Sequence, residues 1–189
     1  MAVAMVTVLY CTGIRFGELH SLRLQDVNWD ERLLHISMTK FYKSRKVPFS
    51  PTVADALKRY IQVRYLQGGP VSPTSGLWWC NAMHRPYSYS FLHKLTTRLI
   101  RAARCKPMPG RQGPRIHDFR HTFAVHCLRD CYRAGRDPQQ MLPYLATYMG
   151  HKDIESTLVY LTMTPDLMKE ATKHFDAMSE LEVFADIRA

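Results

Sequence analysis

The chain has 189 residues, of which 46% are apolar and 11% aromatic, and 26 lysines and arginines against 16 acidic residues give a formal net charge of +10. This composition excludes an intrinsically disordered chain and is typical of one domain that folds around its own core. No apolar run approaches the ~20 residues of a membrane span, so we expect no membrane association. The positive charge favours DNA or RNA as partner over an anionic membrane or an acidic protein.

The first half of the chain alternates short helices with a small sheet. Residues 2–10 form a predicted helix that breaks at Thr12 and Gly13, and a second short helix follows. Two apolar-rich segments, 33–38 and 45–49, are typical of strands and predict a β-hairpin with a basic tip. Ser50 and Pro51 are an N-cap and first-turn pair that begins a long helix ending at Gly68.

The second half is helical apart from one loop. A basic helix is predicted over residues 87–104, and the proline- and glycine-rich stretch 105–115 predicts a loop. Helices then follow over 117–135, 138–149 and 154–161, and a last one begins at 164. The predicted fold class is therefore mainly α with a small antiparallel β-sheet (α+β).

The cysteines give no sign of a disulfide framework. They are five in number, an odd count, and none forms a CxxC pair. Cys127 and Cys131 stand four apart with His121 and His126 nearby, which allows a helical metal site. Two small apolar residues on the buried side of a helix is the favoured interpretation, so we predict reduced thiols and no metal.

A polar cluster stands where the loop 105–115 ends and a helix begins. In the pentad His117-Asp118-Phe119-Arg120-His121, the residues His117, Arg120 and His121 share one helix face. An imidazole and a guanidinium at a helix start can hold a phosphate together. The alternative for the pentad alone is a set of surface polar residues that cap a helix.

Two further clusters accompany this pentad. Thr12 to Leu19 reads TGIRFGEL, with Arg15 between two glycines, and Met149 to His151 reads MGH and precedes Lys152. Together with Lys40 in the hairpin and Tyr160 nine residues after His151, these motifs resemble the catalytic domain of the tyrosine recombinase (phage integrase) family from residue 1 to about 178. The resemblance implies the tyrosine recombinase catalytic-domain fold.

The resemblance also implies a role for each motif residue. Arg15 and Arg120 would neutralise a scissile DNA phosphate, with His117 and His151 beside it. Tyr160 would attack the phosphorus to give a 3′-phosphotyrosine, and Lys40 would protonate the departing 5′-oxygen. The linkage conserves the bond energy, so no cofactor, metal or ATP is expected. The supporting residues are Glu18, Asp118 and His121, and of these Glu18 and Asp118 are expected to orient an arginine or cap a helix. The residues expected to bind DNA are Lys43, Arg45, Lys46 and Lys152.

Two of these assignments have rivals in the sequence. Tyr144 and Tyr148 lie near Tyr160, but both precede His151, whereas the nucleophile of the family follows that histidine. Lys40 competes with its basic neighbours in the hairpin, and its place before the Lys-x-Arg-x-Val-Pro stretch favours it.

The chain departs from the family pattern at three points. Arg120 and His151 are 31 positions apart, longer than usual, with the extra length around residues 133–138. Met149 replaces the leucine of the family motif. No room precedes residue 1 for the amino-terminal core-binding domain, so we expect a single catalytic domain over 1–189. Its core with the active site would be 1–163, and 164–189 a carboxy-terminal helix that can be exchanged between protomers.

The sequence thus predicts a site-specific recombinase of the integrase type that acts on a mobile element or a resolution site. Its expected partner is double-stranded DNA, on which it would form a homo-tetramer, with a monomer in isolation and a cytoplasmic, nucleoid-associated location. A type IB topoisomerase or telomere resolvase shares the same catalytic set and is the first alternative. A non-catalytic DNA-binding fragment is the second.

Overall fold

The computed structural model describes residues 1–37, 44–105 and 113–151, together with Thr157 and Thr172. Contacts divide the chain into two compact units, Met1–Phe123 and Ala124–Ala189. The sequence predicted one domain over the whole chain with a tail from residue 164, and that division of the chain stays a prediction.

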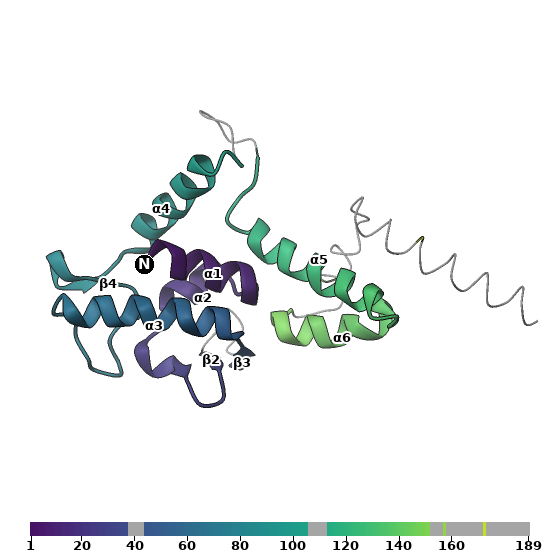
Figure 1. The fold of residues 1–189 in the computed structure, drawn as a ribbon, viewed down its shortest axis with the longest axis horizontal. Coiled ribbons are helices and arrows are strands. Elements are labelled where there is room, and N and C mark those ends of the chain that lie inside the picture. Colours follow the sequence, from purple (N-terminus) through teal and green to yellow (C-terminus); the bar gives the residue numbers. More distant parts are fainter. Residues whose placement is uncertain (38–43, 106–112, 152–156, 158–171, 173–189) are drawn as a thin grey trace, which may run out of the picture. The chain divides into compact units, whose positions relative to one another are not determined.

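Helices dominate the described residues, as predicted (Figure 1). The helices are α1 (Ala2–Thr12), α2 (Phe16–Ser21), α3 (Pro51–Leu66), α4 (Tyr89–Ala102), α5 (Asp118–Arg133) and α6 (Pro138–Met149), with two short 3₁₀ turns, η1 (Leu24–Asp26) and η2 (Asn81–Met83). The strands are β1 (Val27–Asn28), β2 (Leu33–Ile36), β3 (Arg45–Pro48), β4 (Trp79–Cys80) and β5 (Arg85–Pro86). The fold class predicted from the sequence, mainly α with a small antiparallel sheet, is confirmed.

The predicted hairpin forms strands β2 and β3 of a three-stranded antiparallel sheet with the order β1-β2-β3. Its register pairs Leu34 with Val47 and Ile36 with Arg45. Leu34, Ile36 and Val47 are buried, which holds the base of the hairpin on the core of the first unit. β1 and the β4–β5 pair are two-residue strands that the sequence did not predict, because such short segments carry no alternation of apolar and polar residues.

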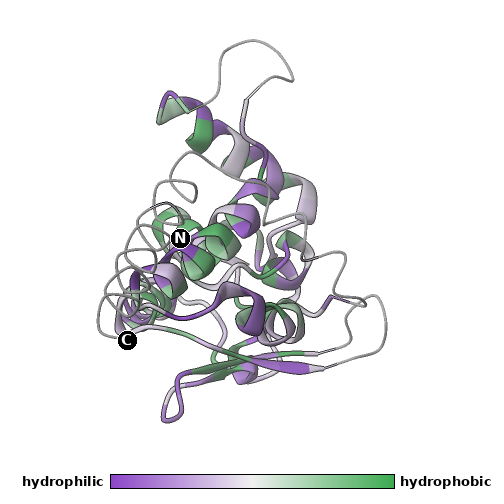
Figure 2. Cartoon of the chain, turned by 90° about the vertical axis from the view of Figure 1, so that its right-hand side faces the viewer, coloured by the Kyte–Doolittle hydropathy of each residue, from purple (hydrophilic) through white to green (hydrophobic). Residues whose placement is uncertain are grey.

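Helix α1 supplies much of the apolar core of the first unit. Ala4, Met5, Val8 and Leu9 are each at most 2% exposed, and α1 packs against α3, α2 and α4. The helix that starts at the marked N-terminus is mostly hydrophobic in Figure 2. Helix α1 ends at Thr12 with Gly13 as its C-cap, and the turn that follows it leads into the candidate site.

Helix ends follow the capping signals of the sequence. The Ser50 hydroxyl accepts from the Val53 N–H at 3.4 Å and begins α3 beside Pro51, as predicted. The Ser88 hydroxyl accepts from the Phe91 N–H at 3.2 Å, so α4 begins at Tyr89 and not at residue 87, where the sequence predicted its start.

In the second unit, α6 has the predicted bounds. The Asp137 carboxylate accepts from the Gln139 N–H at 2.8 Å at its start, and Gly150 ends it with a φ of 64°. The helix predicted over 154–161 and the one from 164 onward lie outside the described residues. Among the residues that the structure describes, no helix has the length and apolarity to cross a bilayer.

Candidate active site

The turn after α1 brings together the residues of the TGIRFGEL motif. Gly13 ends the helix with a φ of +59°, a conformation that side chains disfavour. A Cβ at this position would lie 2.5 Å from Cδ1 of Phe123, so glycine is required here for space as well. Two residues on, Arg15 caps α2, with its own N–H donating to Oε2 of Glu18 at 2.8 Å.

Arg120 reaches this turn from the first part of α5, although it lies 107 positions after Gly13 in the sequence. Its Nη1 donates to the Gly13 carbonyl at 2.8 Å, and the residue is 2% exposed. His117 lies immediately before α5, and its carbonyl accepts from the Arg120 N–H at 3.0 Å. The carbonyl of the motif glycine therefore anchors the second arginine of the predicted site.

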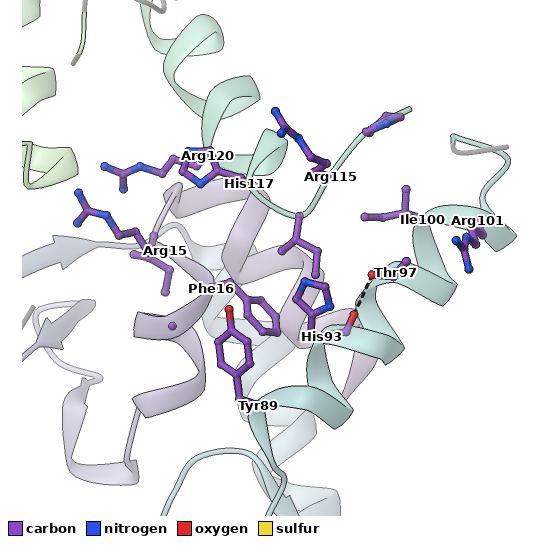
Figure 3. A pocket seen from close by; sticks show the side chains of 14 residues that line it. Arg15, Phe16, Tyr89, His93, Thr97, Ile100, Arg101, Arg115, His117 and Arg120 are labelled. Carbon is purple, nitrogen blue, oxygen red and sulfur yellow. Dashed lines mark hydrogen bonds between the residues drawn. The ribbon is translucent and has the colours of Figure 1, made fainter. Parts of the chain in front are cut away.

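Arg15, His117 and Arg120 line one pocket of about 620 Å³ in the first unit. Figure 3 shows the guanidinium groups of Arg15 and Arg120 extended in the same direction, with the His117 ring beside Arg120. The other residues that line the pocket are Ile14, Phe16, Gly17, Tyr89, His93, Thr97, Ile100, Arg101, Pro114, Arg115 and Ile116. Of the residues that the structure describes, four arginines, two histidines and no carboxylate line this space, which suits a polyanion.

His117 titrates in an environment that disfavours its charged form. Desolvation at the pocket, followed by the positive charge of Arg120, lowers the pKa of His117 below its ordinary value. The lowered pKa favours the neutral form of the ring. A neutral imidazole can accept a proton from a nucleophile or bond to a phosphate oxygen.

The Glu18 carboxylate binds two guanidinium groups, those of Arg15 and Arg45. Its Oε1 accepts from Nη1 of Arg15 at 3.1 Å, and Arg45 of β3 donates from Nη1 and Nη2 to its two oxygens, each at 2.8 Å. Burial alone would raise the pKa of Glu18, but the hydrogen bonds and charges of Arg45 and Arg15 outweigh it and hold that pKa below its ordinary value. The expected contact of Glu18 with an arginine is present.

A second pocket lies on the hairpin side of Arg15. It has a volume of about 620 Å³ and is lined by residues that include Arg15, Glu18, Ile36 and Ser37. Ser37 is the last described residue before the hairpin tip, and Lys40 follows it by three positions.

His151 belongs to the second unit, immediately after the glycine that ends α6. Its N–H donates to the Ala146 carbonyl at 2.9 Å, and its ring Nδ1 lies 2.7 Å from the Thr157 hydroxyl, which is fully buried. This bond orients the half-buried ring through Nδ1. Sequence reasoning missed Thr157, and its only signal is a hydroxyl six residues after the motif histidine.

The remaining predicted residues fall into three groups. The Asp118 carboxylate accepts from the Arg115 N–H at 2.8 Å at the start of α5, the helix-cap role expected of it, and His121 lies one turn further on, outside the pocket lining. The Lys46 side chain is exposed, and its Nζ lies 4.0 Å from Oε2 of Glu31. Lys40, Lys43, Lys152 and Tyr160 lie outside the described residues.

Arg45 pairs with a carboxylate of the first unit. Its guanidinium binds the Glu18 carboxylate and its side chain is 12% exposed, while the DNA contact expected of it from the sequence stays a prediction. Glu18 and Arg45 are 27 positions apart, and nothing in the sequence signals their pairing. Sequence reasoning also missed Tyr89, His93 and Arg101, which α4 adds to the pocket (Figure 3).

Metal ligands do not gather in the part of the chain that the structure describes. There, no group of three histidines, cysteines, aspartates or glutamates has the spacing to hold an ion. Burial raises the pKa of the Cys127 thiol to about 11, so the free thiol is protonated near neutral pH.

Known proteins are similar to this chain in sequence and in fold. The model of the phage integrase family matches residues 2–166. A putative integrase/recombinase of Sinorhizobium fredii, y4rB, is 35% identical over 169 residues, which are 89% of this chain and 54% of that protein. The crystal structure of XerA recombinase superposes with a TM-score of 0.71 at 26% identity, covering 90% of this chain and 57% of that one.

A third likeness is to a protein solved with DNA. The Tn1549 transposon integrase in complex with a circular intermediate DNA superposes with a TM-score of 0.65 at 22% identity, over 90% of this chain and 57% of that one, which shows the shared fold.

The chain spans about half the length of the curated relatives it matches. The family match over most of its length shows that the chain belongs to the phage integrase family of tyrosine recombinases.

Proposed function

We propose that this chain is the catalytic domain of a site-specific DNA recombinase. The observation that carries the proposal is the pocket shared by Arg15, His117 and Arg120, whose lining in the described part of the chain holds four arginines and no carboxylate. Such a pocket binds a phosphodiester and stabilises the additional charge of a pentavalent transition state. Membership of the phage integrase family supports the same chemistry.

The proposed reaction has two steps. The Tyr160 hydroxyl attacks a DNA phosphorus, its proton passes to a base such as neutral His117, and the bond to the 5′-oxygen breaks. Lys40 gives a proton to that leaving oxygen, and a 3′-phosphotyrosine remains. In the second step the 5′-hydroxyl of a partner strand attacks the phosphotyrosine and releases Tyr160. The number of phosphodiester bonds is unchanged, so no ATP is consumed.

Each remaining residue has a supporting part in this proposal. His151, oriented through Thr157, donates to a nonbridging phosphate oxygen, and Glu18 orients Arg15. Lys43, Lys46 and Lys152 contact the DNA backbone outside the scissile phosphate.

We further propose that the active assembly is a tetramer on double-stranded DNA. Residues 164–189 carry an apolar stripe at helical spacing, formed by Leu167, Met168, Ala171, Phe175 and Met178. Docking of this stripe on a neighbouring protomer would link the subunits and couple delivery of Tyr160 to assembly. A DNA-bound tetramer implies a nucleoid-associated protein.

The test is a suicide-substrate assay. The 189-residue chain is incubated with a library of nicked duplexes of random sequence in EDTA and without ATP, and covalent adducts are isolated on denaturing gels and sequenced. We expect adducts enriched in one DNA site, at the 3′ end of the cut, and none with Tyr160→Phe. DNA binding without adducts would favour the non-catalytic alternative. Relaxation of supercoiled plasmid without joining of two sites would favour a topoisomerase.

A further inference from the structure

The carboxylate of Glu18 is shared between two arginines that have different surroundings. Its side chain is 8% exposed, that of Arg15 is 34% exposed and faces the pocket, and that of Arg45 is 12% exposed at the base of the hairpin. One negative charge and two positive charges leave a net charge of +1 for the cluster. The more exposed of the two guanidinium groups lies where a phosphate would bind.

The contacts divide Glu18 unequally between its two partners. Arg45 makes a forked pair with both carboxylate oxygens at 2.8 Å, whereas the side chain of Arg15 donates one bond at 3.1 Å. Forked pairs are stronger and more directional than single bonds. Arg45 therefore supplies most of the neutralisation that a buried carboxylate requires.

Of the two arginines that bind the Glu18 carboxylate in these contacts, only Arg15 would remain after the loss of Arg45. A buried carboxylate with one cation pairs with it as closely as geometry allows, because an uncompensated charge is costly in a low-dielectric site. Arg15 would then turn its guanidinium toward Glu18 and away from the pocket. Its charge would be directed to the protein and not to a ligand.

Arg45 also fixes the strand that leads from the hairpin tip. It is the first residue of β3, pairs in register with Ile36 of β2, and follows Lys40 by five positions. Its bond to Glu18 therefore ties the base of the hairpin to the turn that carries Arg15.

We propose that Arg45 is a positioning residue for DNA cleavage, which neutralises Glu18 so that Arg15 is available to the scissile phosphate and anchors the hairpin base beside it. The inference rests on the proposed function. It differs from a DNA contact by Arg45, because a positioning residue changes the rate of cleavage and leaves binding unchanged.

The experiment compares Arg45→Gln with the parent chain on the suicide duplex selected above. We expect single-turnover adduct formation at saturating DNA to fall about 10- to 100-fold, the equivalent of one charge-assisted contact. The dissociation constant and its salt dependence should stay within about twofold of the parent. Arg59→Gln, which removes an exposed arginine of α3, is the matched charge control and should leave both rate and affinity unchanged.

A double variant separates neutralisation of Glu18 from a general structural effect. If Glu18 competes for Arg15 once Arg45 is gone, then E18Q/R45Q should form adducts several-fold faster than R45Q. A double variant as slow as R45Q, or slower, contradicts the neutralisation. Arg45→Lys provides a variant that keeps the charge and the fold, since one ammonium cannot span both oxygens. Its rate should lie between those of the parent and R45Q.

Two further results would overturn the inference while the proposed function stands. The first is adduct formation by both R45K and R45Q at the same rate as by the parent chain. The second is weaker DNA binding by R45Q, with a salt slope reduced by about one and an unchanged maximal rate, which identifies a phosphate contact. A parent chain that forms no adduct overturns the proposed function, and this inference with it.

Discussion

Substitution of Gly13 by alanine tests the turn that joins the two arginines of the site. The new Cβ would be forced into a φ of +59° and would lie 2.5 Å from Cδ1 of Phe123. The left-handed conformation costs about 1–2 kcal/mol for an alanine, and crowding in a packed interior costs about 1–3 kcal/mol. We expect Gly13→Ala to lower the free energy of unfolding by about 2–4 kcal/mol.

Two glycines of the same unit separate these contributions. Gly68 has a φ of +79° and no atom within 4 Å of the place that a Cβ would take, so Gly68→Ala carries the conformational strain alone and should cost about 1 kcal/mol. Gly17, in α2, has open space around it and no positive φ, so Gly17→Ala should be neutral or stabilising by up to about 1 kcal/mol. Urea unfolding followed by circular dichroism measures all three variants.

The same substitution also tests function. The Gly13 carbonyl accepts from Arg120, so displacement of the turn should move that guanidinium. Misplacement by about 1 Å can cost on the order of 100-fold in rate. We expect adduct formation by Gly13→Ala to fall by at least about 10-fold where the protein is still folded. A variant as stable as Gly68→Ala would refute the clash with Phe123, and a normal cleavage rate in a destabilised variant would refute the link to Arg120.

Three further predictions concern metal, pH and the tail. Cleavage should proceed at the same rate in EDTA, because arginines and Lys40 supply the charge that Mg²⁺ supplies in nucleases, and a rate restored only by magnesium would contradict this. The folded pKa of Glu18 is lowered, so its stabilising contribution is present above its ordinary value of about 4.3 and is lost as pH falls through the folded pKa. The stability gap between parent and Glu18→Gln in urea should therefore shrink below about pH 4.3, and a gap independent of pH would contradict it. Deletion of the residues after Thr164 should spare DNA binding and reduce synapsis and strand exchange, and tetramers formed at the parent level would exclude docking of the tail on a neighbour.

Local signals in the sequence were enough to predict much of the fold. The start of α3 at Ser50 and Pro51 and both ends of α6 depend on capping groups within a few residues of the helix, and such groups are visible in the sequence. The hairpin was predicted from two apolar-rich segments with a polar tip between them. The spacing of His117 and Arg120 likewise places both residues near the start of one helix, whatever the rest of the chain does.

The site itself needed tertiary structure. The bond from Arg120 to the Gly13 carbonyl joins residues 107 positions apart, and the pair of Arg45 and Glu18 joins residues 27 positions apart. Which carboxylate a hairpin arginine meets depends on strand register and on how the sheet packs against α2, and neither is encoded near Arg45 itself. The sequence determined which charged groups are present and where each helix begins. Only the packing decided that one arginine is held by a buried carboxylate while another faces a pocket, because burial makes an unpaired charge costly and so selects the partners.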